Sequence, residues 1–343
     1  MGAKFKFLCV LSFFLAKEGD LMVTFFVALG GNAIKRADEK GTPEEQFRNC
    51  AITCRLIVEM VKRMEKDDRL IITHGNGPQV GNLIVQQEAA KHIVPAQSLD
   101  IIGAMTQGQI GYMLQQTLTN YLRNAGINIP VCAVVNQVLV DKNDPEFFGE
   151  NASKPVGEFL TEEMVEKMKK KHPEYVIKKV KPVGKRVWRR CVPSPDPIAN
   201  VESDVIKKLV DDGVIVIASG GGGIPVILDE NGEYKGVEAV IDKDLAGEKL
   251  AEAVNADVFL VLTNVEEVKL NFGKPNERSV DRMSLTEAKK YLEEGHFLPG
   301  SMEPKVRACI RFLEWGGKRA IITSLDKVLE ALEGKAGTLI YRD

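Results

Sequence analysis

The sequence carries little net charge and few aromatic residues. Its 343 residues have a net charge of −2, and only 6% are Phe, Trp or Tyr. Such a composition provides no basic surface for nucleic acid, so we expect no nucleic-acid partner. The hydrophobic share of 44% is enough for a large buried core, in one large α/β domain or in two smaller ones.

Histidine and cysteine, the usual zinc ligands, are also scarce. Four histidines are scattered along the chain without forming a cluster, and no zinc-ligand spacing is present. Of the six cysteines, only Cys50 and Cys54 lie close together. They are four residues apart on the apolar face of a predicted helix, which favours buried thiols over a metal site or a disulfide. We therefore expect a reduced, cytoplasmic protein.

The first 21 residues differ from the rest of the chain. Two lysines followed by the apolar run 7–16 resemble a short secretory signal. However, cleavage after Ala16 would leave Phe14 where a small residue is preferred, and the run is too short to span a bilayer. Met22 immediately precedes the first credible strand. We interpret residues 1–21 as a leader outside the functional fold, with a signal or a structured extension as alternatives, and expect no membrane association.

Two familiar nucleotide-binding motifs are missing. The sequence contains no Gly-x-x-x-x-Gly-Lys-Ser/Thr loop, and no Gly-x-Gly-x-x-Gly opens a helix after a strand. Instead, three predicted strands end in glycine-rich loops, where backbone N–H groups can approach a charged ligand. We expect the third loop to hold the phosphates of a nucleotide. The loop residues are Gly30, Gly31 and Asn32; Gly75, Asn76 and Gly77; and Ser219, Gly220, Gly221, Gly222 and Gly223.

Apolar runs alternate with helical patterns along the chain. This alternation predicts a mainly parallel sheet whose ligands bind at the carboxyl ends of the strands. Glycines within the helix at 100–124 indicate close packing against another helix or a partner subunit. The predicted strands are 23–29, 70–73, 131–135, 214–218, 258–262 and 320–323, with a hairpin that pairs 226–228 with 237–241. The predicted helices follow Thr42 and Ser284, or span 100–124, 203–212, 244–255 and 304–315.

Residues 141–190 interrupt this alternation. The segment is rich in Lys, Pro and Glu and lacks long apolar runs. We predict that it forms a small lobe or lid that protrudes from a single domain made of residues 22–343. Its lysine run, 169–171, is expected to be a solvated helix face.

Three lysines are candidates for phosphoryl-transfer chemistry, which needs in-line positioning and cations against the charge of the moving group. Lys154, Lys243 and Lys305 each lie beside a turn or a helix start. An ordinary surface position is the alternative for each of them. Asp244 would either orient the neighbouring lysines or simply cap its helix.

Other polar residues near the loops are less certain candidates. His74 is more commonly a strand-end histidine bonded to backbone than an acid or a base. Asn32 and Asn76 are better candidates for anion or carbonyl donors, because both lie inside glycine loops. The arginines within 186–190 either clamp phosphate or lie on the surface.

Seven short segments occur in order along the chain. They are Gly30-Gly31-Asn32-Ala33, His74-Gly75-Asn76-Gly77-Pro78-Gln79-Val80-Gly81, Ser153-Lys154-Pro155-Val156-Gly157, Arg189-Arg190-Cys191-Val192-Pro193-Ser194-Pro195, Gly220 to Pro225, Asp242-Lys243-Asp244, and Pro299-Gly300-Ser301-Met302-x-Pro304-Lys305. Together they resemble the carbamate kinases, a branch of the amino acid kinase superfamily. The segments that begin at Ser153, Arg189 and Pro299 are specific to this branch, whereas the loops at Gly30 and Gly220 indicate only the superfamily.

The resemblance implies an open αβα sandwich, a homodimer, and reversible Mg²⁺-dependent phosphoryl transfer between ATP and carbamate, giving ADP and carbamoyl phosphate. It implies that the first two glycine loops bind the carbamate end and that the third binds the nucleotide phosphates. Lys154 would reach in from the lobe, and Lys243 and Lys305 would stabilise the transferring group, oriented by Asp244. The Mg²⁺ would be held mainly by phosphate oxygens, so no protein ligand is assigned to it. The resemblance assigns the adenine contacts to Thr263, Val265 and Val268.

Two other interpretations remain open. One is another small-carboxylate or nucleotide kinase of the superfamily, such as an acetylglutamate or uridylate kinase, which would need a larger acceptor pocket. The other is a sensor that binds nucleotide or a small metabolite without turnover. The presence of all three lysines argues against a sensor.

Overall fold

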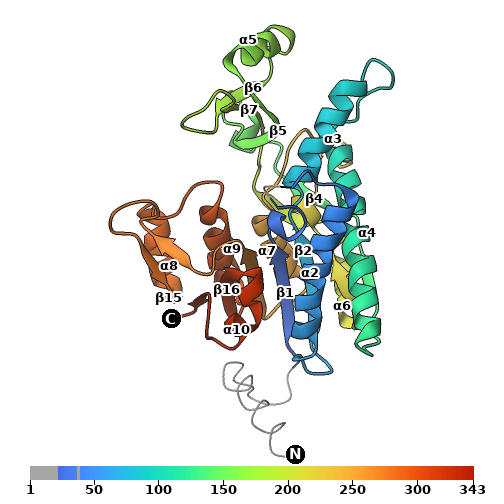
Figure 1. Cartoon of the computed structure of the whole chain (residues 1–343), viewed down its shortest axis with the longest axis vertical. Helices are drawn as coiled ribbons and strands as arrows, with labels where there is room; N and C mark the ends of the chain where they lie inside the picture. Colours follow the sequence, from blue (N-terminus) through green and yellow to red (C-terminus); the bar gives the residue numbers. More distant parts are fainter. Residues whose placement is uncertain (1–21, 37–38) are drawn as a thin grey trace, which may run out of the picture.

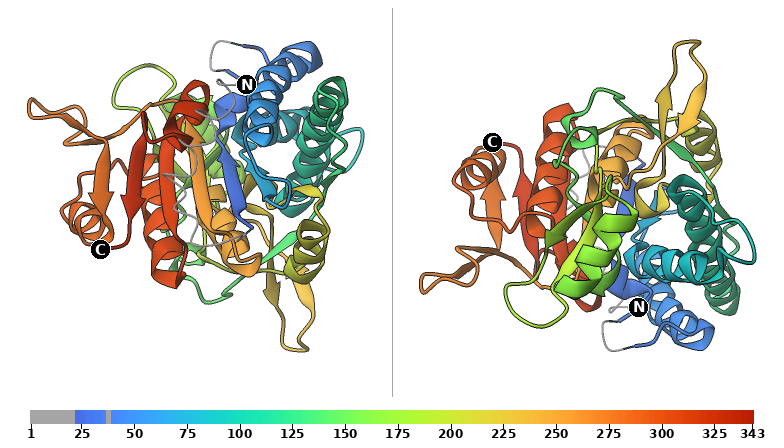
Figure 2. Two further views of the ribbon diagram at one scale, coloured as in Figure 1. Left: turned by 90° about the horizontal axis from the view of Figure 1, so that it is seen from below. Right: turned by 90° about the horizontal axis from the view of Figure 1, so that it is seen from above.

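A sheet of eight strands forms the middle layer of the molecule in the computed structural model (Figures 1 and 2). The structure describes residues 22–36 and 39–343, except for the side chain of Asn32, so the predicted leader at 1–21 lies outside the described residues. The strand order is β15-β17-β16-β12-β1-β2-β9-β3, and all neighbours are parallel except β16 and β17. The predicted mainly parallel sheet is thus confirmed. The strands are β1 (Thr24–Leu29), β2 (Arg69–His74), β3 (Val131–Ala133), β9 (Ile215–Ile217), β12 (Val258–Thr263), β15 (Arg282–Ser284), β16 (Arg319–Ser324) and β17 (Thr338–Tyr341).

Helices cover both faces of this sheet, which gives a three-layer sandwich (Figure 2). Successive side chains of a strand point to opposite faces, so Phe26 and Ala28 pack into one core while Phe25 and Val27 pack into the other. The first core receives α6 (Ser203–Asp211), α7 (Lys243–Ala253), α8 (Leu285–Glu293) and α9 (Met302–Trp315). The second receives α2 (Pro43–Val61), α4 (Leu99–Asn124) and α10 (Val328–Leu332). None of the helices within the described ranges is long and apolar enough to cross a membrane.

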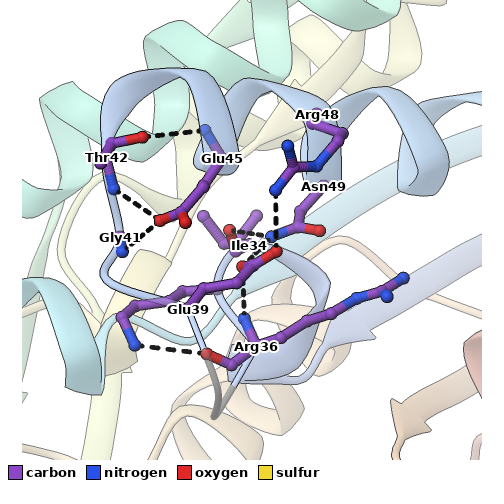
Figure 3. A network of polar contacts seen from close by, with 9 residues as sticks. Ile34, Arg36, Glu39, Gly41, Thr42, Glu45, Arg48 and Asn49 are labelled. Atoms are coloured by element: carbon purple, nitrogen blue, oxygen red, sulfur yellow. Dashed lines mark hydrogen bonds and ion pairs between the residues drawn. The ribbon is translucent and has the colours of Figure 1, made fainter.

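Polar contacts connect Arg36 and Glu39 with residues of α2, and others cap the start of this helix (Figure 3). The predicted cap is present: Thr42 Oγ1 accepts the N–H of Glu45 at 3.3 Å, and Glu45 Oε2 accepts the N–H of Thr42 at 3.0 Å. Glu39 Oε2 accepts the N–H of Arg36 at 3.0 Å and Nδ2 of Asn49 at 2.6 Å. These contacts tie Arg36 and Glu39 to the beginning of α2.

The predicted hairpin exists, but its second strand lies earlier in the chain than the predicted range 237–241. The strands are β10 (Ile224–Leu228) and β11 (Tyr234–Gly236), and Leu228 pairs with Tyr234. Asp229 Oδ1 accepts the N–H groups of Asn231 and Glu233 at 2.8 and 2.9 Å, so the turn is tight and pairing resumes at once. Residues 237–241 instead lead from the hairpin into α7.

A helix that follows the second glycine loop, α3 (Gly77–Ala90), was not predicted. Gly77 was assigned to a loop, yet the following Pro78 fits the first turn of a helix, because a backbone N–H at that position would have no intrahelical acceptor. The helix packs against β5 of the protruding lobe.

The lobe stands at one end of the molecule, next to α3 (Figure 1). It consists of a three-stranded sheet, β5 (Lys154–Leu160), β7 (Trp188–Val192) and β6 (Val176–Lys179), with α5 (Glu162–Lys171). The lobe therefore occupies residues 154–192, whereas the sequence predicted a protruding segment at 141–190.

Two smaller sheets complete the described part: β11-β10-β4-β8, with β4 (Gln137–Val140) and β8 (Pro197–Asn200), and the pair β13 (Val268–Leu270) and β14 (Arg278–Val280). Short 3₁₀ turns lie at Gly31–Ala33, Pro145–Phe147, Gly220–Gly222 and Leu325–Lys327.

Candidate active site

Three lysines from distant segments meet at the start of α7. Lys243 Nζ lies 2.5 Å from Asp244 Oδ1, and Lys305 Nζ of α9 lies 3.0 Å from Asp244 Oδ2. Lys154, the first residue of β5, reaches from the lobe to Asp242 Oδ2 at 2.8 Å. Asp242 is also the N-cap of α7, since its Oδ1 accepts the N–H of Asp244 at 2.9 Å. The structure thus places the three predicted lysines together around two aspartates.

The charge state of this cluster follows from its burial. Burial by itself would raise the pKa of Asp244, but the charges of Lys243 and Lys305 and their hydrogen bonds hold it well below its usual range. Burial also lowers the pKa of Lys243, and Asp244 opposes that shift. Lys305 is buried too, yet the attraction of Asp244 outweighs burial and raises its pKa. Two ammonium groups therefore share one carboxylate, and this leaves a positive charge that an anion in the crevice would neutralise.

A second carboxyl group lies one helical turn beyond Asp244. The Glu248 side chain is fully buried in α7, and burial followed by the neighbouring carboxylate of Glu252 raises its pKa to about 9. It is consequently neutral near pH 7 and adds no negative charge behind the two lysines.

The third glycine loop is packed tightly by its surroundings. Ser219 has a left-handed backbone with φ of 54°, and its N–H donates to Oδ1 of Asn136 at 2.7 Å. At Gly221, where φ is 66°, a Cβ atom would lie 2.0 Å from Nδ2 of Asn76. Glycine is therefore required there by the protein itself and not only by the approach of a ligand. The Ser219 hydroxyl is buried without a hydrogen-bond partner among the described residues, which leaves it available to a ligand.

The first two glycine loops lie side by side because β1 and β2 are parallel neighbours, with Leu29 paired to His74. A Cβ atom on Gly75 would lie 3.2 Å from the backbone N of Gly31 and 3.5 Å from Cδ of Lys243. The loops therefore adjoin the lysine cluster. The other residues predicted to bind the substrate, Gly30, Asn32, Asn76 and Gly77, lie in the same two chain segments.

The structure describes two of the three other polar candidates, Asn76 and His74. The Asn76 side chain donates to Oγ1 of Thr106 at 2.9 Å, so its amide is engaged inside the protein, whereas the Asn32 side chain lies outside the described part. His74 bonds to the carbonyl of Gly75 at 3.2 Å. Burial, and then the charge of Lys243, lower the pKa of His74 to about 4, although that backbone contact opposes the shift. It is therefore neutral near pH 7, in line with the favoured interpretation.

A small cavity of about 80 Å³ opens at the carboxyl end of β12. Lys305 belongs to its wall, so the cavity adjoins the lysine cluster. Val268, which the sequence assigned to the adenine, is not part of the wall and is fully buried in the core. The wall includes Thr263, Val265, Phe272, Leu298 and Met302.

The arginines of the lobe contact other lobe residues, and Arg190 also donates to Oε2 of Glu238, outside the lobe, at 3.3 Å. Arg189 donates to the carbonyl of Gly157 at 2.8 Å, and Arg190 stacks on Tyr175 with its Cζ 4.0 Å from the ring centre. Arg186 forms an exposed ion pair with Glu158. None of these contacts faces the lysine cluster, so the alternative of a phosphate clamp gains no support.

Sequence reasoning missed Asp242 and two residues whose side chains bond to the third loop, Asn136 and Gln107. Gln107 Nε2 donates to the carbonyl of Gly220 at 3.2 Å. Asp242 stood in the Asp-Lys-Asp segment, and its place directly before a helix was the available signal. Asn136 and Gln107 gave no local signal, because they act across 83 and 113 residues.

Comparisons with known proteins identify a family and several relatives. The family model described as "Amino acid kinase family" matches residues 24–324. The chain is 54% identical to the carbamate kinase of Thermococcus kodakarensis and 53% identical to that of Pyrococcus furiosus, in both cases over 92% of this chain and 98% of the relative. It also resembles the structure of the carbamate kinase from Giardia lamblia bound to AMP-PNP, with a TM-score of 0.84 and 42% identity over 94% of this chain and 99% of that one.

Proposed function

The chain belongs to the amino acid kinase family and, within it, to the carbamate kinases, and from this premise we propose how its crevice transfers a phosphoryl group between ATP and carbamate. The observation that carries the proposal is the convergence of Lys154, Lys243 and Lys305 on Asp242 and Asp244. Fixed cations are what phosphoryl transfer requires, since charge spreads over the oxygens of the moving group.

In the direction of carbamoyl phosphate formation, a carboxylate oxygen of carbamate forms a bond to the γ-phosphorus of ATP. The bond from that phosphorus to the bridging oxygen breaks, and its electrons leave with ADP. Because the attacking oxygen is already anionic, no general base is needed, which suits a site whose nearby His74, with its pKa lowered to about 4, is only a weak base. Lys243 and Lys305 stabilise the moving group, Asp244 orients them, and Lys154 completes the cluster from the lobe.

Different glycine loops bind the two substrates. The turns at residues 30–32 and 75–77 present backbone N–H groups to carbamate, an anion too small for long side chains to surround. The loop 219–223 presents N–H groups and the Ser219 hydroxyl to the nucleotide phosphates. The cavity at Thr263 and Val265 takes the edge of the adenine, with Phe272, Leu298 and Met302 in place of Val268.

Magnesium would enter with the nucleotide. Among the described residues there is no group of three or more His, Cys, Asp or Glu side chains that could hold a metal ion. The carboxylates of Asp242 and Asp244 are occupied by lysines and by a backbone N–H. The phosphate oxygens of ATP would therefore provide most Mg²⁺ ligands, and no step above depends on a protein-held metal.

The activity can be measured in its ATP-forming direction. Purified protein mixed with ADP, MgCl₂ and carbamoyl phosphate should produce ATP, detected by luciferase. Omitting carbamoyl phosphate is the control, and acetylglutamate or UMP with ATP tests the other acceptors. ADP released with one of those acceptors, but no ATP from carbamoyl phosphate, would contradict the proposal.

We also propose that two copies of the chain associate through α4. Along this helix Ile101, Met105 and Tyr112 form an exposed apolar stripe, at 44%, 41% and 55% exposure. Gly108 lies within the stripe, and a Cβ atom there would meet nothing within 4 Å. No described residue therefore packs closely against Gly108, whereas Gly111 does pack against Ala133 of the edge strand β3.

A double substitution tests this association. We expect sedimentation equilibrium to give twice the chain mass for the unaltered protein and the single mass for Met105→Glu combined with Tyr112→Glu, because buried charges would disrupt an apolar interface. Val183→Glu, at an 80% exposed position of the lobe, is the control. A dimer that survives the double substitution would place the interface elsewhere.

A further inference from the structure

One carboxylate holds together the two segments that connect the lobe to the body of the molecule. Ser153 directly precedes β5, and Ser194 follows β7 after one residue. Glu146 Oε2 accepts the N–H of Ser153 at 2.9 Å and the N–H of Ser194 at 3.0 Å. A single oxygen thus fixes the incoming and outgoing chains at the neck of the lobe.

The neck is tied in turn to the helix that carries Lys305. Asp144 Oδ1 accepts the N–H of Glu146 at 2.9 Å, and its Oδ2 accepts the N–H of Asp196 at 2.9 Å. The Asp196 carboxylate forms two hydrogen bonds with Arg311 of α9, at 2.6 and 2.7 Å. Lys305 lies six residues earlier on the same helix. Lobe and body are therefore connected by a continuous set of charge-assisted hydrogen bonds.

We propose that Glu146 is a positioning residue for the phosphoryl transfer, acting through Lys154. Glu146 touches neither substrate in the arrangement described above. It fixes the residue next to Lys154, whose ammonium group must reach across from the lobe to Asp242. The inference rests on the role proposed for Lys154. Displacing a catalytic group by about 1 Å can cost on the order of 10²-fold in rate, so a loosened neck should be visible in kcat.

The choice of substitutions follows from the two hydrogen bonds. Alanine removes the oxygen that accepts both hydrogen bonds. Glutamine keeps one carbonyl oxygen that can accept both N–H groups, and aspartate keeps the charge but shortens the reach by one methylene. The exposed Glu150, which lies in the same connecting segment, provides the control substitution Glu150→Ala.

We expect Glu146→Ala to lower kcat by roughly tenfold, while the dissociation constant for ATP, measured by equilibrium titration, changes less than twofold. Glu146→Gln should restore most of the rate, Glu146→Asp only part of it, and Glu150→Ala should match the unaltered enzyme. In a Lys154→Ala background, Glu146→Ala should cause no further loss, because both act on the same step.

Three results would overturn the inference. They are an unchanged kcat in Glu146→Ala, a full rate in Glu146→Asp, and a loss in the double variant equal to the product of the single losses. If Glu146→Ala does not fold, the aspartate and glutamine variants decide by the same comparison. A Lys154→Ala enzyme with full activity would instead refute the role proposed for Lys154, and the inference about Glu146 with it.

Discussion

Replacing Lys243 or Lys305 by alanine should lower kcat by about 10²- to 10³-fold, the loss typical of removing one preorganised donor to a developing charge. Both ammonium groups are largely buried, at 12% and 16% side-chain exposure, so water cannot substitute for them efficiently. The nucleotide should still bind, because the loop 219–223 and the cavity at Thr263 provide separate contacts. Turnover of ADP and carbamoyl phosphate and equilibrium titration with ATP measure the two effects separately.

The control for this experiment is Lys207→Ala, which removes an exposed ion pair with Asp211 on α6 and should leave kcat unchanged. Lys243→Arg adds a charge-preserving test. Its planar guanidinium is larger than an ammonium group and should not fit beside Asp244, so we expect little recovery. A kcat within twofold of the unaltered enzyme in either alanine variant would remove that lysine from the mechanism.

Local patterns predicted most of the sandwich. Buried parallel strands are apolar on both faces, so β1 and β12 stand out as continuous runs, and the capping box at Thr42 marks the start of α2. The misplaced second hairpin strand shows the limit of such patterns. Its position depended on how tightly Asp229 closes the turn, which is a matter of side-chain geometry rather than composition.

The candidate site was predicted by residue type and only partly by contact. The lysines and glycine loops were identifiable because they lie at turns and helix starts, and Asp244 was expected to orient Lys243 and Lys305. The more distant contacts were not predicted, because Lys154 meets Asp242 across 88 residues and Glu146 meets Ser194 across 48. Burial also changes the assignment of Val268, which the resemblance placed at the adenine, because Val268 is fully buried in the core.

Replacing Asp244 by asparagine should have the second large effect, on both stability and kcat. Asp244→Asn leaves two buried ammonium groups without their shared anion, and breaking a buried ion pair in this way costs about 3–5 kcal/mol of unfolding free energy. We also expect kcat to fall by about 10²-fold, because the lysines lose the group that orients them. Urea unfolding and steady-state kinetics measure the two losses. Asp211→Asn, at the surface end of the Lys207 pair, should change neither.

The pH dependence distinguishes this electrostatic origin from a simple packing defect. The pKa of Asp244 is depressed in the folded protein, so its contribution to stability is present above the ordinary carboxyl pKa of about 3.9 and is lost as the pH falls toward the folded value. In Asp244→Asn, Lys243 loses the charge that opposes its burial, so its pKa falls further. That variant should regain stability as the pH rises toward the unfolded lysine pKa of about 10.4, where the unfolded state binds more protons. The difference in unfolding free energy between the two proteins should therefore be largest near neutral pH and shrink at both extremes; a difference independent of pH would indicate a packing defect instead.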